Sequence, residues 1–141
     1  MPPTPLSNFS FLQPHDEQLA RLGLLAEKYL LDDPNTSLIK LRQYAELLAQ
    51  TVSAQMQLYN NEPESQYDLL LRLRMENVLA DEIYQLFGEI RRAGNDASHN
   101  AGGDYPRALC CLKIAWQLGI WFERTFYRRD FTPAEFFTRQ I

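Results

Sequence analysis

The chain has 141 residues, enough for one domain that buries most of its apolar side chains in a single core. Apolar residues make up 45% and charged residues 23%, which excludes a disordered or fibrous chain. The formal net charge of -4, from 14 basic and 18 acidic residues, excludes a uniformly basic nucleic-acid clamp, so any nucleic-acid contact has to be local.

Residues 1–12 are expected to form an N-terminal arm, because three prolines within the first ten residues favour an extended chain. Phe9, Phe11 and Leu12 are apolar and allow this arm to pack back on the body of the domain. We therefore expect the arm to be partly ordered.

Residues 13–130 are predicted to form a helical bundle, because apolar residues recur there every three or four positions and no alternating run predicts a strand. The helices are expected over about 16–31, 36–52, 65–74, 80–92 and 106–128. The clearest core-facing stripe consists of Leu38, Leu41, Ala45, Leu48 and Val52. The predicted fold class is all-α, an antiparallel bundle of four to six helices.

Particular residue types mark the expected helix ends. Asn35 or Thr36 is expected to cap the second helix, and Ser65 is expected to begin the third. Gly94 is the residue type found just past a helix C-terminus, so the fourth helix is expected to end at Arg92 and to be followed by a turn.

The helix expected over 106–128 is predicted to be the longest, and it is apolar on more than one side. One small bundle does not easily cover that much apolar surface. The pattern therefore predicts a symmetric homodimer with Trp116 and Trp121 at its interface.

Residues 131–141 are predicted to be a C-terminal tail that contains a short helix and leads to a following domain. Thr132, Pro133 and Glu135 have the order of an N-cap, a first-turn proline and a third-position glutamate. Phe136 and Phe137 would belong to this short helix and suggest a docking contact.

The segment from Arg91 to His99 holds the residue types that handle phosphate. Arg91 and Arg92 offer planar donors to phosphate oxygens, and His99 is able to exchange a proton near neutral pH. The same residues are also typical of a helix end, where basic side chains complement the helix dipole. Spacing alone favours this structural interpretation.

The sequence lacks the motifs of several other common kinds of site. The sequence contains no HExxH, paired CxxC, phosphate-loop or nucleophile-elbow pattern, so we expect no metal and no cofactor. Adjacent residues on a helix point about 100° apart, so Cys110 and Cys111 are not placed to form a disulfide, and a reduced, cytoplasmic setting is expected. Without a signal sequence or an apolar run of ~20 residues, the chain is expected to be neither exported nor embedded in a membrane.

Four stretches of the sequence together match one known pattern: residues 32–42 with Tyr44-Ala45-Glu46, residues 86–92 with Gly94, Asn95 and His99, residues 7–12, and the end of the long helix around Trp121. These stretches resemble the N-terminal helical domain of the restriction (motor) subunit of type I restriction-modification enzymes. In that family the domain precedes an endonuclease domain and a helicase motor, so this chain is expected to be an excised domain or a stand-alone relative. The resemblance implies a non-catalytic module that docks on the neighbouring nuclease and helicase domains, on the methyltransferase core or on itself.

That family is in turn similar to the HEPN superfamily, helical bundles whose active members cut RNA without a metal, usually as dimers that bring two motifs together. Carried over by position, Arg92 would contact the phosphate, Asn95 would be the polar partner, and His99 would be the acid/base at the ribose 2′-hydroxyl. Six residues separate Arg92 from His99, at the long end of the superfamily pattern.

Three hypotheses follow from these resemblances. A docking module is preferred, and a metal-independent ribonuclease acting as a homodimer is the main alternative. The third hypothesis, which ranks between these two, is a regulatory domain that senses RNA or DNA through Arg91 and Arg92 without cleaving it.

Overall fold

A computed structural model describes residues 6–58, 60–100 and 103–139. Within these ranges the chain forms one short 3-10 helix and five α-helices, and none of these residues lies in a strand. The elements are η1 (Ser10–Leu12), α1 (Glu17–Tyr29), α2 (Pro34–Gln55), α3 (Gln66–Met75), α4 (Asp81–Asn100) and α5 (Tyr105–Phe126). The predicted all-α bundle is confirmed.

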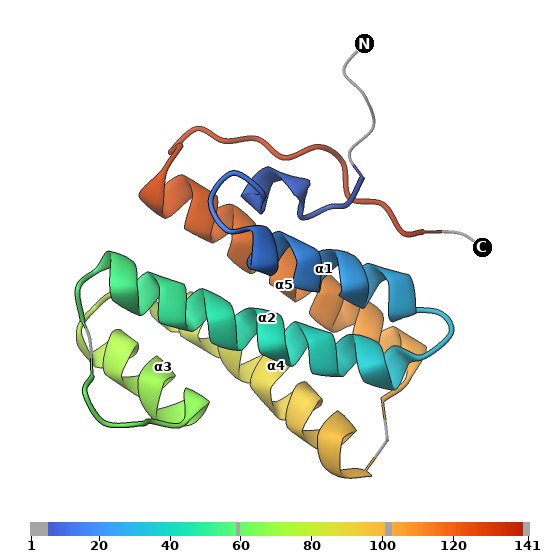
Figure 1. Ribbon diagram of the computed structural model, residues 1–141, viewed down its shortest axis with the longest axis horizontal. Coiled ribbons are helices and arrows are strands. Elements are labelled where there is room, and N and C mark those ends of the chain that lie inside the picture. Colours follow the sequence, from blue (N-terminus) through green and yellow to red (C-terminus); the bar gives the residue numbers. More distant parts are fainter. Residues whose placement is uncertain (1–5, 59, 101–102, 140–141) are drawn as a thin grey trace.

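The bundle is built around α2. In Figure 1, α1 and α2 run in opposite directions and are joined by a short turn, and α4 and α5 form a second antiparallel pair. The short α3 packs beside α2 and α4 at one end of the bundle. Helix α2 packs against all four other helices, which makes it the centre of the fold.

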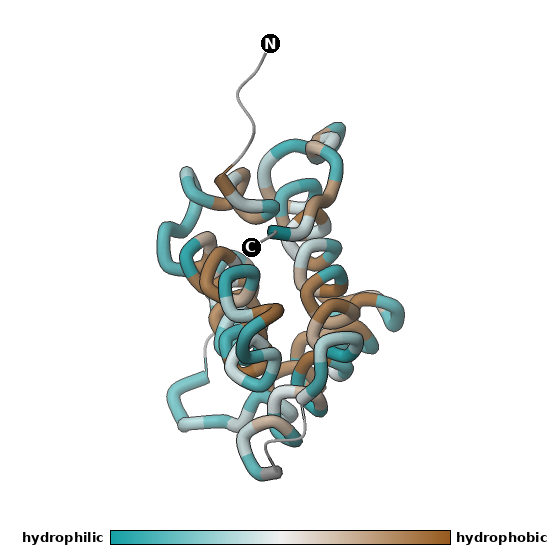
Figure 2. Tube along the Cα trace, turned by 90° about the vertical axis from the view of Figure 1, so that its right-hand side faces the viewer, coloured by the Kyte–Doolittle hydropathy of each residue, from teal (hydrophilic) through white to brown (hydrophobic). Residues whose placement is uncertain are grey.

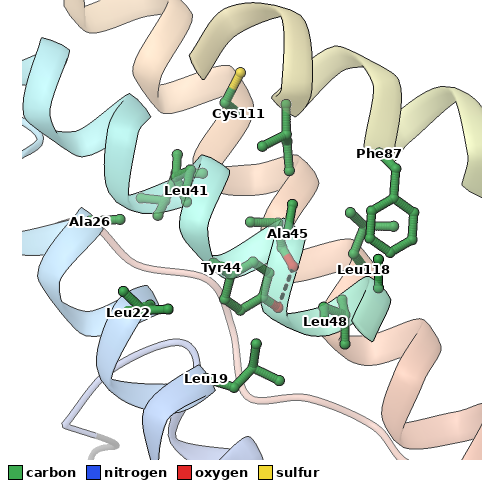
Figure 3. Close-up of a cluster of buried hydrophobic side chains, with 14 of the residues drawn as sticks. Leu19, Leu22, Ala26, Leu41, Tyr44, Ala45, Leu48, Phe87, Cys111 and Leu118 are labelled. Carbon is green, nitrogen blue, oxygen red and sulfur yellow. Dashed lines mark hydrogen bonds between the residues drawn. The ribbon is translucent and has the colours of Figure 1, made fainter. Parts of the chain in front are cut away.

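The core is formed by the apolar sides of the helices. The predicted stripe of α2 is buried throughout: Leu38, Leu41, Ala45, Leu48 and Val52. Tyr44 is also fully buried, and its hydroxyl donates to the carbonyl of Ala115 at 2.8 Å, as Figure 3 shows within the surrounding leucines. Figure 2 shows the apolar segments facing one another across the bundle, while the polar segments face outward.

Side chains cap the N-termini of α1, α2, α3 and α5 by accepting from backbone N–H groups. Ser65 caps α3 as expected, accepting from Asp68. The expected cap of α2 at Asn35 or Thr36 is wrong, because Asp33 takes that role and accepts from the backbone of Thr36 at 3.1 Å. Pro34 then occupies the first turn, where its missing N–H costs nothing.

Helix α4 does not end at Arg92 but continues to Asn100. Gly94 therefore lies inside the helix, and no described glycine has a positive φ. A Cβ at Gly94 would lie only 2.5 Å from the Cβ of Arg42 on α2. This glycine is explained by the close crossing of α2 and α4, not by a helix stop.

The two ends of the described chain pack on the bundle instead of extending from it. Phe9 and Leu12 of the arm are fully buried. Residues 131–139 contain no helix, so the predicted terminal helix is wrong for the described part of the tail. This segment runs back beside η1 (Figure 1), and the ring of Phe136 packs against Trp116 with centroids 5.2 Å apart.

Helix α5 begins after an Asp104 cap, with Pro106 in its first turn as predicted. It has 22 residues, the same length as α2, so it shares the greatest length among the described helices and is not longer than all others as predicted. Among the described residues, no helix is long and apolar enough to cross a membrane.

Candidate functional site

The residues predicted to form a phosphate-handling site lie on the C-terminal half of α4. Because the helix continues past Gly94, Arg92, Asn95 and His99 are spaced at i, i+3 and i+7 and share one face. They span two turns, and the Cα atoms of Arg92 and His99 are about 10 Å apart along the axis. The structure therefore aligns these residues but does not bring them into contact.

The two arginines point to different neighbours. Arg92 folds back over Gly88, where a Cβ would lie 3.1 Å from its Nη1, and its Nη2 lies 3.4 Å from a carboxylate oxygen of Glu89. The guanidinium of Arg91 lies 5.3 Å from the centre of the Tyr67 ring on α3. The pair does not form a common clamp.

His99 is exposed and Asn95 is half-buried, in a part of α4 that is tied to its surroundings. One turn away from Arg92, Asp96 pairs with Arg107 of α5 at 2.9 Å, and the hydroxyl of Ser98 accepts from Arg42 at 2.7 Å. Five pockets on the described surface are lined by other residues. This face of α4 is held rigidly but is not enclosed.

Helix α4 is also fastened where it leads into α5. The Asn35 side chain donates to the carbonyl of Ala97 at 2.9 Å and accepts from the backbone of Gly103 at 3.1 Å. One residue that sequence reasoning assigned to a helix cap thus joins the start of α2 to the end of α4 and to the connection that follows it. His99 is presented from a fixed helix end as a result.

A buried ionic cluster lies at the other end of α5, and sequence reasoning missed it. Glu123 is fully buried, and its carboxylate lies 2.9 and 3.1 Å from Nε2 of His15 and 3.4 Å from a guanidinium nitrogen of Arg128. The His15 ring stacks on Tyr127 at 3.5 Å between centroids. This cluster anchors the end of α5 to the turn before α1.

A second buried carboxylate, Glu27, fastens the two chain ends. It accepts from the backbone and side chain of Asn8 at 2.9 and 2.7 Å and lies 3.6 Å from Arg139. Burial raises the pKa of the Glu27 carboxyl, against the hydrogen bonds from Asn8. The Asn8 amide in turn bonds to both backbone groups of Phe137.

A sequence signal exists for both buried carboxylates. Glu27 follows Gly23 by four positions and precedes Leu30 by three, and Glu123 follows Gly119 by four, so each lies on the apolar side of its helix. A carboxylate in such a position needs partners, because an unpaired buried charge is costly.

The predicted interface tryptophans are half-buried and pack within the chain. Trp121 meets Phe87 and Phe126 edge to face, at 6.4 and 6.2 Å between centroids, and Trp116 packs on Phe136. Their apolar rings therefore do not require a second subunit. A homodimer stays a prediction.

The described residues include no group of three His, Cys, Asp or Glu side chains that could hold a metal ion. Cys110 and Cys111 are free thiols, one exposed and one buried. Burial raises the pKa of the Cys111 thiol to about 11, so this thiol stays protonated at neutral pH, and of the two only Cys110 is open to solvent.

The fold is thus a small all-α bundle in which exposed Arg92, half-buried Asn95 and exposed His99 share one face of α4. The chain is 36% identical over 119 residues to the type I restriction enzyme EcoKI endonuclease subunit of Escherichia coli (strain K12). No protein-family model matches it, and no solved structure matches it.

The match to the Escherichia coli subunit covers 84% of this chain but only 10% of the relative. The chain is therefore a homologue of a type I restriction enzyme endonuclease subunit over most of its own length, and it spans about a tenth of that subunit. The resemblance to restriction subunits is confirmed at this level.

Proposed function

We propose that this chain is a non-catalytic helical docking module of a type I restriction enzyme endonuclease subunit or of a related defence helicase. The observation that carries the proposal is the match itself, which covers 84% of this chain and a tenth of a much longer subunit. A short segment of a long subunit has the remaining domains as its nearest partners. The nuclease and helicase domains and the methyltransferase core are the expected contacts.

The geometry of α4 supports a role without catalysis. A general acid and a phosphate-binding arginine have to reach one phosphodiester, and hydrogen-bond reach is about 3 Å. Arg92 instead lies over Gly88 and pairs with Glu89, on the side away from His99. Arg92 and His99 are therefore separate surface side chains of α4, and this helix is fixed by its packing against the other helices.

A chimera tests this proposal. The matched segment of the Escherichia coli subunit is replaced by this chain, and restriction of an unmodified phage is measured beside a variant in which the segment is deleted. We expect the chimera to restrict and the deletion variant to fail. His99→Ala in the chimera should restrict as well as the parent.

Two results would overturn the docking proposal. The first is normal restriction by the deletion variant, or a folded chimera that does not restrict. The second is loss of restriction in His99→Ala at unchanged abundance and melting temperature, which would make the histidine a functional group.

A metal-independent HEPN-type ribonuclease is the second candidate, and one observation favours it. Arg92, Asn95 and His99 share an exposed face of α4 instead of being scattered over a turn. The test is cleavage of single-stranded RNA by the purified chain with a chelator present. Cleavage that is lost in His99→Ala and kept in the matched surface variant Gln85→Ala would establish the ribonuclease.

The sensing alternative depends on Arg91 and Arg92, and the same preparation tests it. Fluorescence anisotropy with an RNA and a DNA oligonucleotide measures binding, which has to weaken steeply with salt if phosphate contacts carry it. Binding without cleavage that is lost in Arg92→Gln would support a sensor. We expect neither cleavage nor such binding.

A further inference from the structure

One side of α5 faces mostly away from the other helices. At 100° per residue, six side chains fall within about 40° of a single line down the helix: Pro106, Cys110, Lys113, Gln117, Ile120 and Arg124. The opposite line carries Ala108, Ala115 and Phe122, which are fully buried against the other helices. Five of the six residues on the outward line are exposed and Ile120 is buried, so the other helices leave most of this side of α5 uncovered.

Two shallow pockets lie on this outward side. The first has a volume of about 350 Å³ and is lined by Tyr105, Pro106, Leu109, Cys110 and Lys113. The second has a volume of about 290 Å³ and is lined by Gln117, Ile120, Trp121, Arg124 and Thr125. Together we call them the α5 groove.

The spacing of the two pockets suits a helix. Cys110 and Trp121 line different pockets and are eleven residues apart, which corresponds to about 17 Å along the axis and about 20° around it. On a second helix, residues at i and i+11 are about 17 Å apart and lie on one face, because eleven residues make almost three whole turns. Two apolar side chains at this spacing would enter both pockets.

The charged side chains on the outward side of α5 are all basic. Its only acidic residue, Glu123, is fully buried beside His15 and Arg128, and Arg107 is paired with Asp96. This leaves the cationic groups of Lys113 and Arg124 on the outward line. The chain as a whole has a net charge of -4, so this basic strip differs from the average of the molecule.

Both basic side chains are partly fixed in place. The Nε of Arg124 donates to the carbonyl of Phe131 at 2.8 Å, and Nζ of Lys113 lies 5.9 Å from the centre of the Phe136 ring. The tail thus braces the two cationic groups at the groove. Because the two cationic groups are held in place before a partner binds, less side-chain entropy is lost on binding.

We propose that the α5 groove binds one acidic amphipathic helix of a partner protein, with two apolar anchors about eleven residues apart and carboxylates that meet Lys113 and Arg124. The proposal rests on the docking function and names its surface and the chemistry of the partner. A second copy of this chain fits poorly, because the α5 grooves of two copies would place like charges against each other.

Selective labelling allows a direct test on the whole chain. Bromobimane at neutral pH alkylates exposed Cys110 inside the groove, whereas buried Cys111 is protected. The probe peptide is an 18-residue helix with two leucines eleven positions apart and glutamates beside them. The first control peptide has its second leucine moved to the opposite face, and the second has lysines in place of the glutamates.

We expect the acidic peptide to shift the bimane emission and both control peptides to bind at least tenfold more weakly. Lys113→Glu with Arg124→Glu should weaken binding of the acidic peptide by at least tenfold. The matched pair Arg21→Glu with Lys28→Glu makes the same change of charge on exposed positions of α1 and should leave binding unchanged. Circular dichroism checks that all variants fold.

Equal binding of the acidic and lysine peptides, no shift with any peptide, or a shift produced by an RNA oligonucleotide instead would overturn the proposal. The chimera separates this failure from failure of the docking function. If the parent chimera restricts and the Lys113→Glu, Arg124→Glu chimera restricts equally well, the groove is excluded while docking by another surface stands. We expect restriction to be lost in this double variant and kept in the α1 control.

Discussion

The two glycines of α4 respond in opposite ways to the same substitution. Replacing glycine by alanine inside a helix stabilises it by about 1 kcal/mol through backbone propensity. At Gly88 the new methyl group would lie 3.1 Å from Nη1 of Arg92, the end of a flexible and half-exposed side chain that is able to swing away. Gly88→Ala is therefore expected to raise the free energy of unfolding by about 0.5–1 kcal/mol.

At Gly94 the same methyl group would lie 2.5 Å from the Cβ of Arg42, which moves only if the α2 backbone moves. Overpacking of this kind costs about 1–3 kcal/mol, which exceeds the gain in propensity. Gly94→Ala is expected to lower the free energy of unfolding by about 1 kcal/mol, so the two variants differ by about 2 kcal/mol. The close approach of α2 and α4 is the only source of that difference.

Urea unfolding followed by circular dichroism at a helix band measures both variants against the parent chain. The control is the slope of the transition, which has to stay the same for the comparison to hold. If Gly94→Ala were as stable as Gly88→Ala, the two helices would have room for a methyl group at their crossing. The explanation of Gly94 by close packing would then be refuted.

Three further substitutions test the buried polar contacts. Tyr44→Phe removes the 2.8 Å bond to the carbonyl of Ala115, and it should cost about 1 kcal/mol in urea unfolding; no loss would mean that the bond adds nothing. Asn8→Ala removes both bonds to the Phe137 backbone and should speed hydrogen exchange of that amide while the amides of the bundle core stay protected. Because burial raises the pKa of Glu27 above 4.5, its stabilising contribution is full below that pH and is lost as pH rises through the folded pKa. The melting temperature of Glu27→Gln should therefore rise relative to that of the parent chain as pH rises from about 4 to 7. A difference between the two melting temperatures that stays constant with pH would contradict the raised pKa.

The helices and their buried stripes were predictable from the sequence because they depend on apolar residues that recur every three or four positions. The five α2 residues expected in the core are all buried, and the Ser65 cap and the first-turn Pro106 are where the sequence places them. Each of these features is decided within one or two turns of chain. A single sequence is enough to find such features.

The features that were not predicted depend on contacts between distant parts of the chain. In the sequence, Gly94 is typical of a residue that ends a helix, and only the structure shows that Arg42 packs closely against it. The tail has good helix-start residues, yet Phe136 gains more contact on Trp116 than a short isolated helix would provide. The partner of Glu123 is His15, 108 positions away, and no local pattern specifies such a pair.

The same limitation applies to the candidate site, and the geometry of α4 decides what each hypothesis requires. Helical side chains lean toward the N-terminus, so Arg92 and His99 lean in the same direction and their separation of about 10 Å persists within one chain. Two α4 helices crossing antiparallel near Asn95, midway between them, would instead place the arginine of one copy beside the histidine of the other. A ribonuclease therefore needs a dimer formed through α4, whereas the docking proposal needs a complex formed through α5. A cysteine placed at Asn95 in a chain lacking Cys110 would cross-link readily in the first case, and no such disulfide is expected in the second.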